Sequence, residues 1–345
     1  MIDRSLTRFA AVGIPALAAV ALSGCKAPQA FGERQDLVIR ADSVLWSQVE
    51  PAVLETMEAR VFTTHPERTF EVTYVAPGDT LWQDFRLFWN VLVMGTPQDE
   101  LVADLVDDSD NPDARPPAIV HVGDRWARGQ LVTVLLLPEQ GTGPAVRDIL
   151  PDLFADLKDA YDDWVTRRMY SSGVNDSLGQ VLSDAGFVLD VPKVYEFYRE
   201  DSIFRFRNVL QQGDRELFRS LLVTWHDGVE APPPDSLLAW RRQLGDRYYE
   251  PAQDVQQEGL RWDTVRVAGT DALELRGVFH DRTEFPAAGP FVTRAIPCPG
   301  EDRTYYLDAW LYAPGTDKYP YLRQLEILMG SFRCGAAGGA PVSGG

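Results

Sequence analysis

Two hydrophobic periods alternate along this chain and limit it to folds that mix strands with helices. Phe70, Val72 and Tyr74 recur at every second position, which is the spacing of a half-buried strand. Residues 144–169 place apolar side chains at helical spacing over a much longer stretch. The expected fold class is therefore α+β, in two mixed α/β halves whose mostly antiparallel sheets are covered by helices.

The expected elements alternate in both halves. In the first half we expect strands at residues 37–39, 70–74, 90–94, 118–121 and 130–137, helices at 42–59, 81–88 and 144–169, and a polar loop over 95–117. In the second half we expect strands at residues 193–198, 203–210, 218–226, 272–279, 290–296 and 305–312, and helices at 177–185, 235–244 and 319–332. In the second half, after its first short helix, the order of three strands, a helix, three strands and a helix indicates either an internal duplication or an antiparallel sheet covered by helices. It is loosely similar to the PsbP-like fold, an architectural likeness that implies no activity.

The length of the chain suffices for one large core or two modest ones, and we expect two. Residues 173–177 are small and polar and lie between two apolar-periodic segments, which is typical of a junction. The expected organisation is a signal peptide at 1–24, a lipidated tether at 25–34, an N-terminal α+β domain at 35–172, a C-terminal α+β domain at 173–334 and a disordered tail at 335–345.

The N-terminal segment has the three parts of an export signal. Arg4 and Arg8 lie in a weakly basic start, residues 9–22 are apolar, and Leu22-Ser23-Gly24-Cys25 resembles the lipobox of bacterial lipoproteins. The resemblance implies cleavage before Cys25, a diacylglycerol on its sulfur and an acylated new N-terminus, such as a palmitate chain. An ordinary signal peptide with a chance cysteine, or a buried core helix, is the alternative.

This N-terminus also sets the expected location. The apolar stretch of residues 9–22 is shorter than the roughly 20 residues that a spanning helix needs, whereas two or three acyl chains anchor a protein stably. Lys26 differs from the Asp that retains lipoproteins at the inner membrane of enteric bacteria. We therefore expect a lipid-anchored envelope protein, held at the outer membrane through Cys25 and facing the periplasm.

The remaining cysteines, Cys298 and Cys334, form an even pair in an exported protein, where disulfides persist. A bridge between them would close a loop of about 36 residues and contribute on the order of 3 to 4 kcal/mol to stability. Two unpaired thiols are the alternative.

The formal net charge of −18 argues against nucleic acid as a partner, because a surface this negative repels phosphate polyanions. The acidic run from Asp104 to Asp113 lacks the Gly and the terminal Glu of a calcium-binding EF-hand loop. We interpret it as a solvated loop.

Several motifs resemble those of the domain of unknown function 4837 lipoproteins and spread over nearly the whole chain after the export signal. In chain order they are Phe85-Arg86-Leu87-Phe88-Trp89-Asn90, Asp124-Arg125-Trp126-Ala127-Arg128-Gly129-Gln130, Leu275-Arg276-Gly277-Val278-Phe279, Gly289-Pro290-Phe291-Val292, Tyr312-Ala313-Pro314-Gly315-Thr316-Asp317-Lys318 and Tyr321-Leu322-Arg323-Gln324-Leu325-Glu326. The chain departs from the family pattern at Phe279, where a Trp is expected, and at residues 285–288. The family has no established activity, so the resemblance implies an anchored envelope protein and supplies no catalytic residues.

The spacings of common catalytic and phosphate-binding motifs are absent from the sequence, so we expect no catalytic, cofactor-binding or metal-binding residues. His226-Asp227 and His280-Asp281 each follow an apolar strand and offer metal-ligand chemistry only if the two strand ends meet; otherwise they are solvated ends. The tryptophans at 126, 225, 240, 262 and 310 are expected to pack in the core and not to form a sugar-stacking platform.

Two functions are consistent with these observations. The first is a noncatalytic envelope module that binds a protein or a small ligand, with a candidate binding surface at Arg276, Gly289, Pro290 and Phe291. The second is a hydrolase of envelope polymers that uses a pair of acidic side chains in a cleft between the halves. A deep cleft with facing carboxylates would favour the enzyme, and a shallow groove lined by residues 289 and 290 with exposed aromatic side chains would favour binding.

Overall fold

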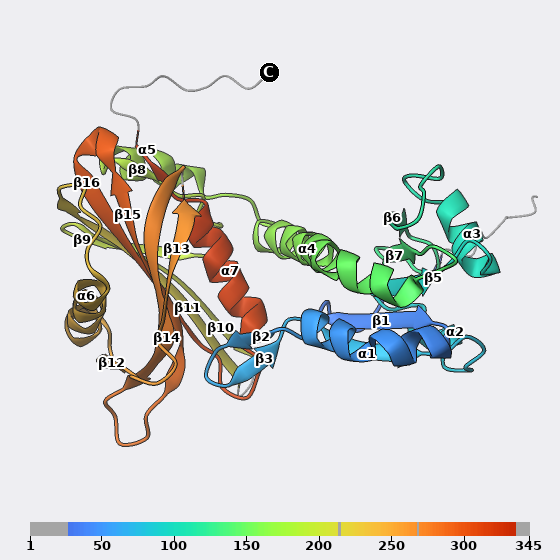
Figure 1. Ribbon diagram of the computed structural model, residues 1–345. Helices are drawn as coiled ribbons and strands as arrows, with labels where there is room; N and C mark the ends of the chain where they lie inside the picture. The colour runs from blue at the N-terminus through green and yellow to red at the C-terminus, as the bar shows by residue number, and fades with distance from the viewer. Residues whose placement is uncertain (1–26, 213–214, 268, 336–345) are drawn as a thin grey trace, which may run out of the picture.

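The computed structural model describes residues 27–212, 215–267 and 269–335. Two lobes lie side by side, one formed by the first half of the chain and one by the second (Figure 1). In the described residues, no helix combines the length and the apolar run that crossing a membrane requires. The expected signal peptide at 1–24, the lipidation site Cys25 and residues 336–345 of the expected tail lie outside the described residues.

The first lobe is built on a five-stranded sheet in the order β4-β1-β5-β7-β6. Its strands are β1 (Asp36–Ala41), β4 (Glu71–Val75), β5 (Asn90–Gly95), β6 (Ala118–Gly123) and β7 (Leu131–Leu136), and a separate hairpin consists of β2 (Arg60–Phe62) and β3 (Pro66–Arg68). Its helices are α1 (Ser43–Met57), α2 (Trp82–Phe85), α3 (Glu100–Asp107) and α4 (Thr142–Met169).

Helices cover both faces of this sheet. Buried residues of α1 and α4 form one core with Leu37, Ile39 and Leu92, and buried residues of α3 form another with Val38 and Val91. Strands that are buried on both faces favour parallel pairing, because the crossover helices cover the sheet. β1 accordingly pairs in parallel with β4 and β5, and β5 with β7, whereas β6 runs antiparallel to β7.

The second lobe contains an eight-stranded sheet in the order β12-β14-β15-β16-β11-β10-β9, with β13 paired to β14. Its strands are β8 (Phe187–Val188), β9 (Glu196–Glu200), β10 (Ile203–Gln212), β11 (Arg215–Asp227), β12 (Gln253–Val255), β13 (Arg261–Val267), β14 (Thr270–Asp281), β15 (Ala288–Cys298), β16 (Arg303–Tyr312) and β17 (Arg333–Cys334). Its helices are η1 (Asp176–Leu178), α5 (Gly179–Asp184), α6 (Pro234–Tyr248), η2 (Pro299–Glu301) and α7 (Tyr319–Gly330).

This large sheet is antiparallel in all of its pairings, so the expected α+β class is confirmed for the molecule, with the mostly parallel sheet of the first lobe as an exception. Helix α7 lies on the face that looks toward the first lobe and α6 on the opposite face (Figure 1). Leu322, Leu325 and Leu328 of α7 enter one core, and Leu237 of α6 enters the other.

Two expectations about local structure are corrected. The polar loop expected over 95–117 contains α3, which Asp99 caps by accepting hydrogen bonds from the backbone N–H groups of Leu101 and Val102. The acidic side chains of this segment had indicated a loop, but they lie on the solvent side of a helix that buries Val102 and Leu105. In the second lobe, β12 and β13 were missed because neither strand has a clear apolar alternation.

The segment expected as a flexible tether packs on the first lobe from residue 28 onward. The backbone N–H of Ala30 donates to the carbonyl of Arg128, and that of Phe31 donates to the carbonyl of Leu87. The Ala30 side chain is buried. The free part of any tether is therefore shorter than residues 25–34.

The expected disulfide between Cys298 and Cys334 is confirmed. It joins the end of β15 to β17, which pairs with β8. The bridge therefore holds the chain that follows α7 against the large sheet.

Candidate functional site

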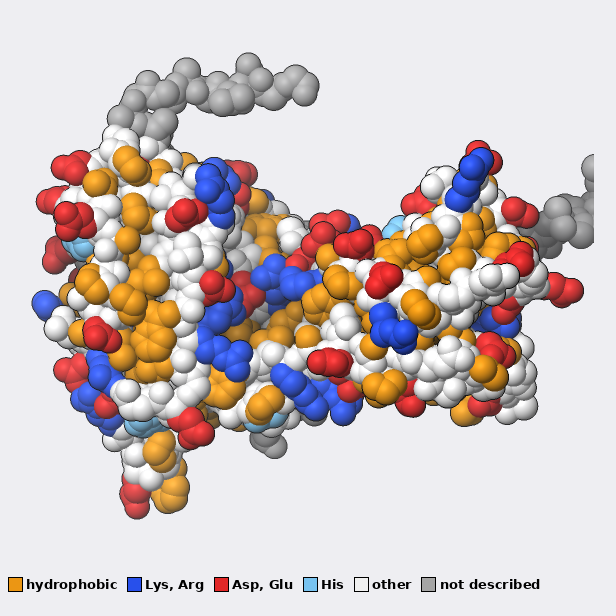
Figure 2. Space-filling model, in the orientation of Figure 1, with side chains coloured by type: hydrophobic (Ala, Val, Ile, Leu, Met, Phe, Trp, Pro, Cys, Tyr) orange, Lys and Arg blue, Asp and Glu red, His pale blue; other side chains and the backbone are white. Residues whose placement is uncertain are grey.

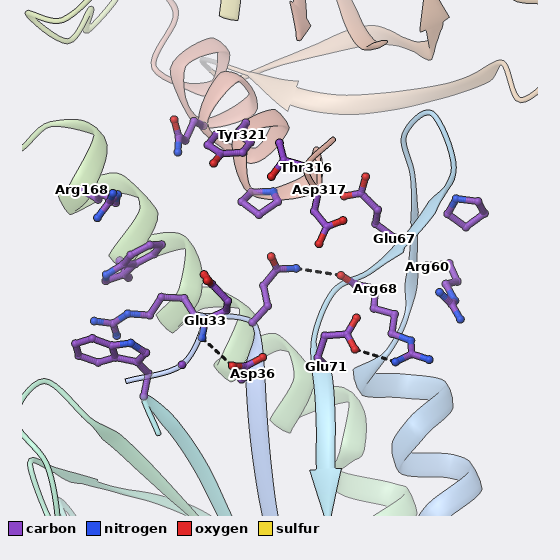
Figure 3. A pocket seen from close by; sticks show the side chains of 18 of the residues that line it. Glu33, Asp36, Arg60, Glu67, Arg68, Glu71, Arg168, Thr316, Asp317 and Tyr321 are labelled. Carbon is purple, nitrogen blue, oxygen red and sulfur yellow. Dashed lines mark hydrogen bonds and ion pairs between the residues drawn. The ribbon is translucent and has the colours of Figure 1, made fainter. Parts of the chain in front are cut away.

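A cavity of about 930 Å³ lies where the two lobes meet, and we call it the cleft. The first lobe lines it with the segment that enters β1, the start of β4, the β2–β3 hairpin and the last turns of α4, and the second lobe with residues 316–324. Figure 3 shows Asp36 and Arg168 of the first lobe around the same opening as Asp317 and Tyr321 of the second. Basic side chains gather along the junction of the lobes in Figure 2.

Glu67 on the β2–β3 hairpin fixes one end of the cleft. Its buried carboxylate accepts hydrogen bonds from the backbone N–H groups of Lys318, at 2.8 Å, and Tyr319, at 2.6 Å, and from the hydroxyl of Thr63. Helix α7 has no capping side chain of its own, so a residue of the other lobe caps it. Tyr319 then stacks on Tyr161 of α4 with ring centroids 6.0 Å apart, inside the core of the first lobe.

Arg323 of α7 makes the second connection between the lobes. Its Nε and Nη2 each donate to a different carboxylate oxygen of Asp162 on α4 at 2.7 Å, and its Nη1 donates to Glu326 at 2.7 Å. Glu326 also accepts from Arg276 of β14. Burial raises the pKa of Asp162, but hydrogen bonds from Arg323 and Lys158 outweigh this and hold the pKa below its ordinary value. A chain of paired charges therefore joins α4 to α7 and, through Arg276, to the large sheet.

The basic wall of the cleft begins just before β1. Gly32 has a φ of +86° and lies so close to Phe88 that a Cβ would sit 2.7 Å from that ring, so this turn favours glycine. The backbone carbonyl of Arg34 then accepts a hydrogen bond from Nδ2 of Asn90 at 2.6 Å. These contacts fix the backbone from which the Arg34 side chain enters the cleft.

The guanidinium of Arg34 lies among aromatic rings and other cations. Its central carbon is 3.5 Å from the ring centroid of Trp89 and 4.9 Å from that of Trp164 on α4. Burial, followed by the charges of Arg167 and Arg168, lowers the pKa of Arg34 to about 10. In the described residues, no carboxylate forms an ion pair with this guanidinium. This corner of the cleft therefore concentrates positive charge in a chain whose net charge is −18.

An acidic wall of the cleft lies beside the corner that holds Arg34. Asp36 and Glu71 are register partners at the starts of the parallel strands β1 and β4. Burial raises the pKa of Asp36 above its ordinary value, and the charges of Glu33 and Glu71 add to this, while a hydrogen bond from the backbone N–H of Glu33 opposes it. Glu71 is paired with Arg68, whose Nη1 donates to it at 2.8 Å. Asp36 is thus a carboxylate under negative potential.

One group in the described residues offers metal-ligand chemistry. Ligand atoms of His65, Glu67 and Asp317 lie within 4.8 Å of one another at the edge of the cleft. Both oxygens of Glu67 already accept hydrogen bonds, from the hydroxyl of Thr63 and from the backbone N–H groups of Lys318 and Tyr319 at the N-terminus of α7. A cation there would displace the cap that joins the lobes, so the arrangement fits docking better than metal binding.

The residues expected to form a binding surface lie elsewhere. Gly289, Pro290 and Phe291 are buried in β15, which is paired on both sides, and a Cβ on Gly289 would lie 1.8 Å from the carbonyl oxygen of Leu311. Arg276 pairs with Glu274 and Glu326 and belongs to the chain of charges that leads to the first lobe. These four residues build the sheet and its connection to α7, and present no joint surface.

The histidine–aspartate pairs do not meet. β16 and β15 separate β11 from β14 in the antiparallel sheet, so residues 226–227 and 280–281 end at opposite edges. His121 lies 3.1 Å from Asp156 of α4, a partner that the sequence did not reveal.

Sequence reasoning missed Arg34 and Trp164 entirely. Trp89 lies in a motif that was noted only for its resemblance, as do Asp317, Tyr321 and Gln324 at the opposite wall. The convergence of two distant motifs on one cavity was the available signal, but it needs the fold to become visible.

Comparison with known proteins supports the family resemblance for the second half of the chain. Residues 175–331 match the family model described as Domain of unknown function (DUF4837). No curated protein matches the chain. A solved structure of the Ran-binding protein Mog1p of Saccharomyces cerevisiae is similar at 11% identity, over 44% of this chain and 91% of that one, with a TM-score of 0.30. LpqN, described as involved in cell envelope biogenesis of Mycobacterium tuberculosis, is similar at 12% identity, over 43% of this chain and 82% of that one, with a TM-score of 0.28.

Proposed function

We propose that this chain is a lipid-anchored envelope protein that binds a small charged ligand in the cleft between its lobes without transforming it. The observation that carries the proposal is Arg34, a partly buried cation without an acidic partner in the described residues, in a cavity lined by both lobes. The half-buried guanidinium has lost part of its hydration, and no described carboxylate is paired with it. A ligand that supplies the missing charge would satisfy this arginine.

The size of the cavity supports the same conclusion. Small-molecule sites usually measure roughly 300 to 1,000 Å³ and combine aromatic side chains with a few fixed polar groups. The cleft, at about 930 Å³, has Trp89 and Trp164 beside charged side chains of both signs. Its walls are held by Glu67 and Arg323, so the site is formed before a ligand arrives.

Native mass spectrometry of the full chain, extracted with detergent from its own envelope, tests the binding role. We expect the wild-type protein to carry a small molecule and Thr316→Trp, which places a bulky ring in the cleft, to lose it. Thr264→Trp, at an exposed position of β13, is the matched control and should keep the molecule. Equal occupancy in Thr316→Trp, or a wild-type protein that takes up nothing from the small-molecule fraction of the envelope, would contradict the proposal.

The anchor is a separate part of the proposal and rests on Leu22-Ser23-Gly24-Cys25. Metabolic labelling with radioactive palmitate should mark the wild-type protein and leave Cys25→Ser unlabelled. Mass spectrometry should find an acylated N-terminus at Cys25. An unmodified product that starts at Met1 would overturn both the anchor and the envelope location.

A carboxylate-dependent hydrolase of envelope polymers is the second candidate, and the raised pKa of Asp36 inside the cleft is the observation that favours it. A general acid needs a raised pKa to hold its proton near neutral pH. If purified protein degrades envelope polymers in a gel assay and Asp36→Asn abolishes this, the enzyme replaces the binding module. We expect no degradation by either protein.

A further inference from the structure

The environment of Arg34 specifies more about the ligand than its charge. The rings of Trp89 and Trp164 lie against the guanidinium, and no hydrogen bond joins its nitrogen atoms to another described residue. Stacking on aromatic faces leaves the N–H edge of a guanidinium for polar contacts. That edge matches a planar carboxylate, which can accept two parallel hydrogen bonds.

Neighbouring cations strengthen this preference. Arg168 lines the cleft, and its guanidinium carbon lies 5.6 Å from the ring centroid of Trp164, the same ring that Arg34 contacts. The low pKa of Arg34 reports burial and repulsion from Arg167 and Arg168. An anion between these guanidinium groups would relieve both effects.

The rest of the cleft disfavours a ligand that is only negative. Glu33, Asp36 and Asp317 line the same cavity, together with Arg60 and Arg68, and the charges of Glu33 and Glu71 act on Asp36. A phosphate dianion or a polyacid would be repelled by this wall. A ligand that carries an ammonium group at some distance from its carboxylate would instead be attracted at both ends.

We infer that the cleft takes a short zwitterionic peptide, whose terminal carboxylate is bound by Arg34 with Arg168 nearby and whose ammonium group faces Asp36 and Glu33. This inference rests on the proposed binding function and names its ligand class. The cavity of about 930 Å³ is large enough for a molecule of drug-like size, so a peptide of a few residues fits better than a single amino acid.

Isothermal titration calorimetry of the full chain in detergent with three probes tests whether the cleft recognises both ends of the peptide. The probes are trialanine, trialanine amide, which lacks the carboxylate, and N-acetyltrialanine, which lacks the ammonium group. We expect trialanine to bind and each modified peptide to bind at least about tenfold more weakly, because each loses a charge-assisted hydrogen-bonded contact.

Variants assign the carboxylate to its partner. Arg34→Gln should weaken trialanine binding at least about tenfold and abolish the preference over the amide, and Arg34→Lys should recover only part of it, since an ammonium lacks the planar fork. Arg266→Gln removes an equal charge from an exposed site on β13 and should bind as the wild type does. Thermal unfolding of each variant checks that it is folded.

Equal binding of trialanine and its amide, or wild-type affinity in a folded Arg34→Gln, would overturn this inference. So would failure of all three peptides to bind. In that event, a small molecule found in the cleft of protein extracted from its own envelope would leave the proposed function standing, and its absence would remove both.

Discussion

Two regions of the molecule hold an arginine against aromatic rings, and they treat its charge in opposite ways. Under α6, the fully buried Arg241 has its Nε 2.8 Å from Asp308 and donates from Nη2 to Gln253 at 2.7 Å. Asp308 in turn accepts hydrogen bonds from Tyr249 and Thr293. We call these five residues the α6 cluster. In the cleft, Arg34 has aromatic neighbours but no such acceptors among the described residues.

The difference separates structure from function. A charge in the interior is tolerated when the fold supplies an opposite charge, as Asp308 does for Arg241. In the cleft, the described residues surround Arg34 but provide no carboxylate that pairs with it. The informative feature is the missing partner, since both arginines have aromatic neighbours and Arg34 is half-buried where Arg241 is buried.

The largest expected effect comes from breaking the α6 cluster. Asp308→Ala leaves Arg241 buried and unpaired, which should lower the free energy of unfolding by about 3 to 5 kcal/mol. Urea denaturation followed by circular dichroism measures this. Asp271→Ala removes a carboxylate that is exposed and paired to Arg266, and it should change stability by less than about 0.5 kcal/mol. A loss below about 1 kcal/mol in Asp308→Ala would mean that the α6 cluster stabilises the fold no more than an exposed ion pair does.

An intermediate effect is expected at the junction of the lobes. Arg323→Ala removes the bidentate pair with Asp162 and the contact with Glu326, which should lower the free energy of unfolding by about 1 to 3 kcal/mol. The pKa of Asp162 is held low, so its contribution is present at neutral pH and is lost as pH falls through that pKa. As pH falls below about 3.8, the ordinary pKa of an aspartate, the difference between variant and wild type should therefore shrink. A difference that stays constant from pH 7 down to pH 2 would show that the pair does not stabilise the junction electrostatically.

Raising the pH into the alkaline range should change the contributions of the two arginine regions to the free energy of unfolding in opposite directions. Burial, with the charge of Asp308, raises the pKa of Tyr249 well above 10, so the folded protein keeps a proton that the unfolded chain loses, and stability falls with rising pH. The pKa of Arg34 is lowered to about 10, below the ordinary value of an arginine, so its contribution to the free energy of unfolding rises with pH above about pH 10.

Tyr249→Phe should therefore flatten the alkaline decline in the free energy of unfolding, by up to about 1.4 kcal/mol per pH unit, and Arg34→Gln should steepen it slightly. Urea titrations at several pH values from 8 to 11 give these slopes. If the free energy of unfolding has the same pH slope in both variants and the wild type, Tyr249 and Arg34 do not contribute with opposite signs.

The smallest effect is expected when Arg34 itself is removed. Arg34→Gln loses contacts with Trp89 and Trp164 but also ends the repulsion from Arg168, so stability should change by less than about 1 kcal/mol. The same urea assay measures it. A loss as large as that of Asp308→Ala would mean that Arg34 has a structural partner after all.

Much of the fold could be predicted from local patterns. The period-two runs around Phe70 and the helical period of α4 depend on neighbouring residues alone, and the structure has both elements. The bridge between Cys298 and Cys334 followed from counting cysteines once Cys25 was assigned to the lipid. Helix α3 was not predicted, because its acidic side chains indicated a solvated loop although Val102 and Leu105 of the same segment are buried.

The residue order by itself determined the mixed strands and helices, the acidic character and the disulfide pair, because these depend on near neighbours or on composition. Only the tertiary structure decided that Arg34 would meet Trp89 and Trp164, and that Glu67 would cap a helix of the other lobe. Such contacts join residues far apart in the chain, and no periodicity encodes which distant side chains the packing of two lobes will bring together.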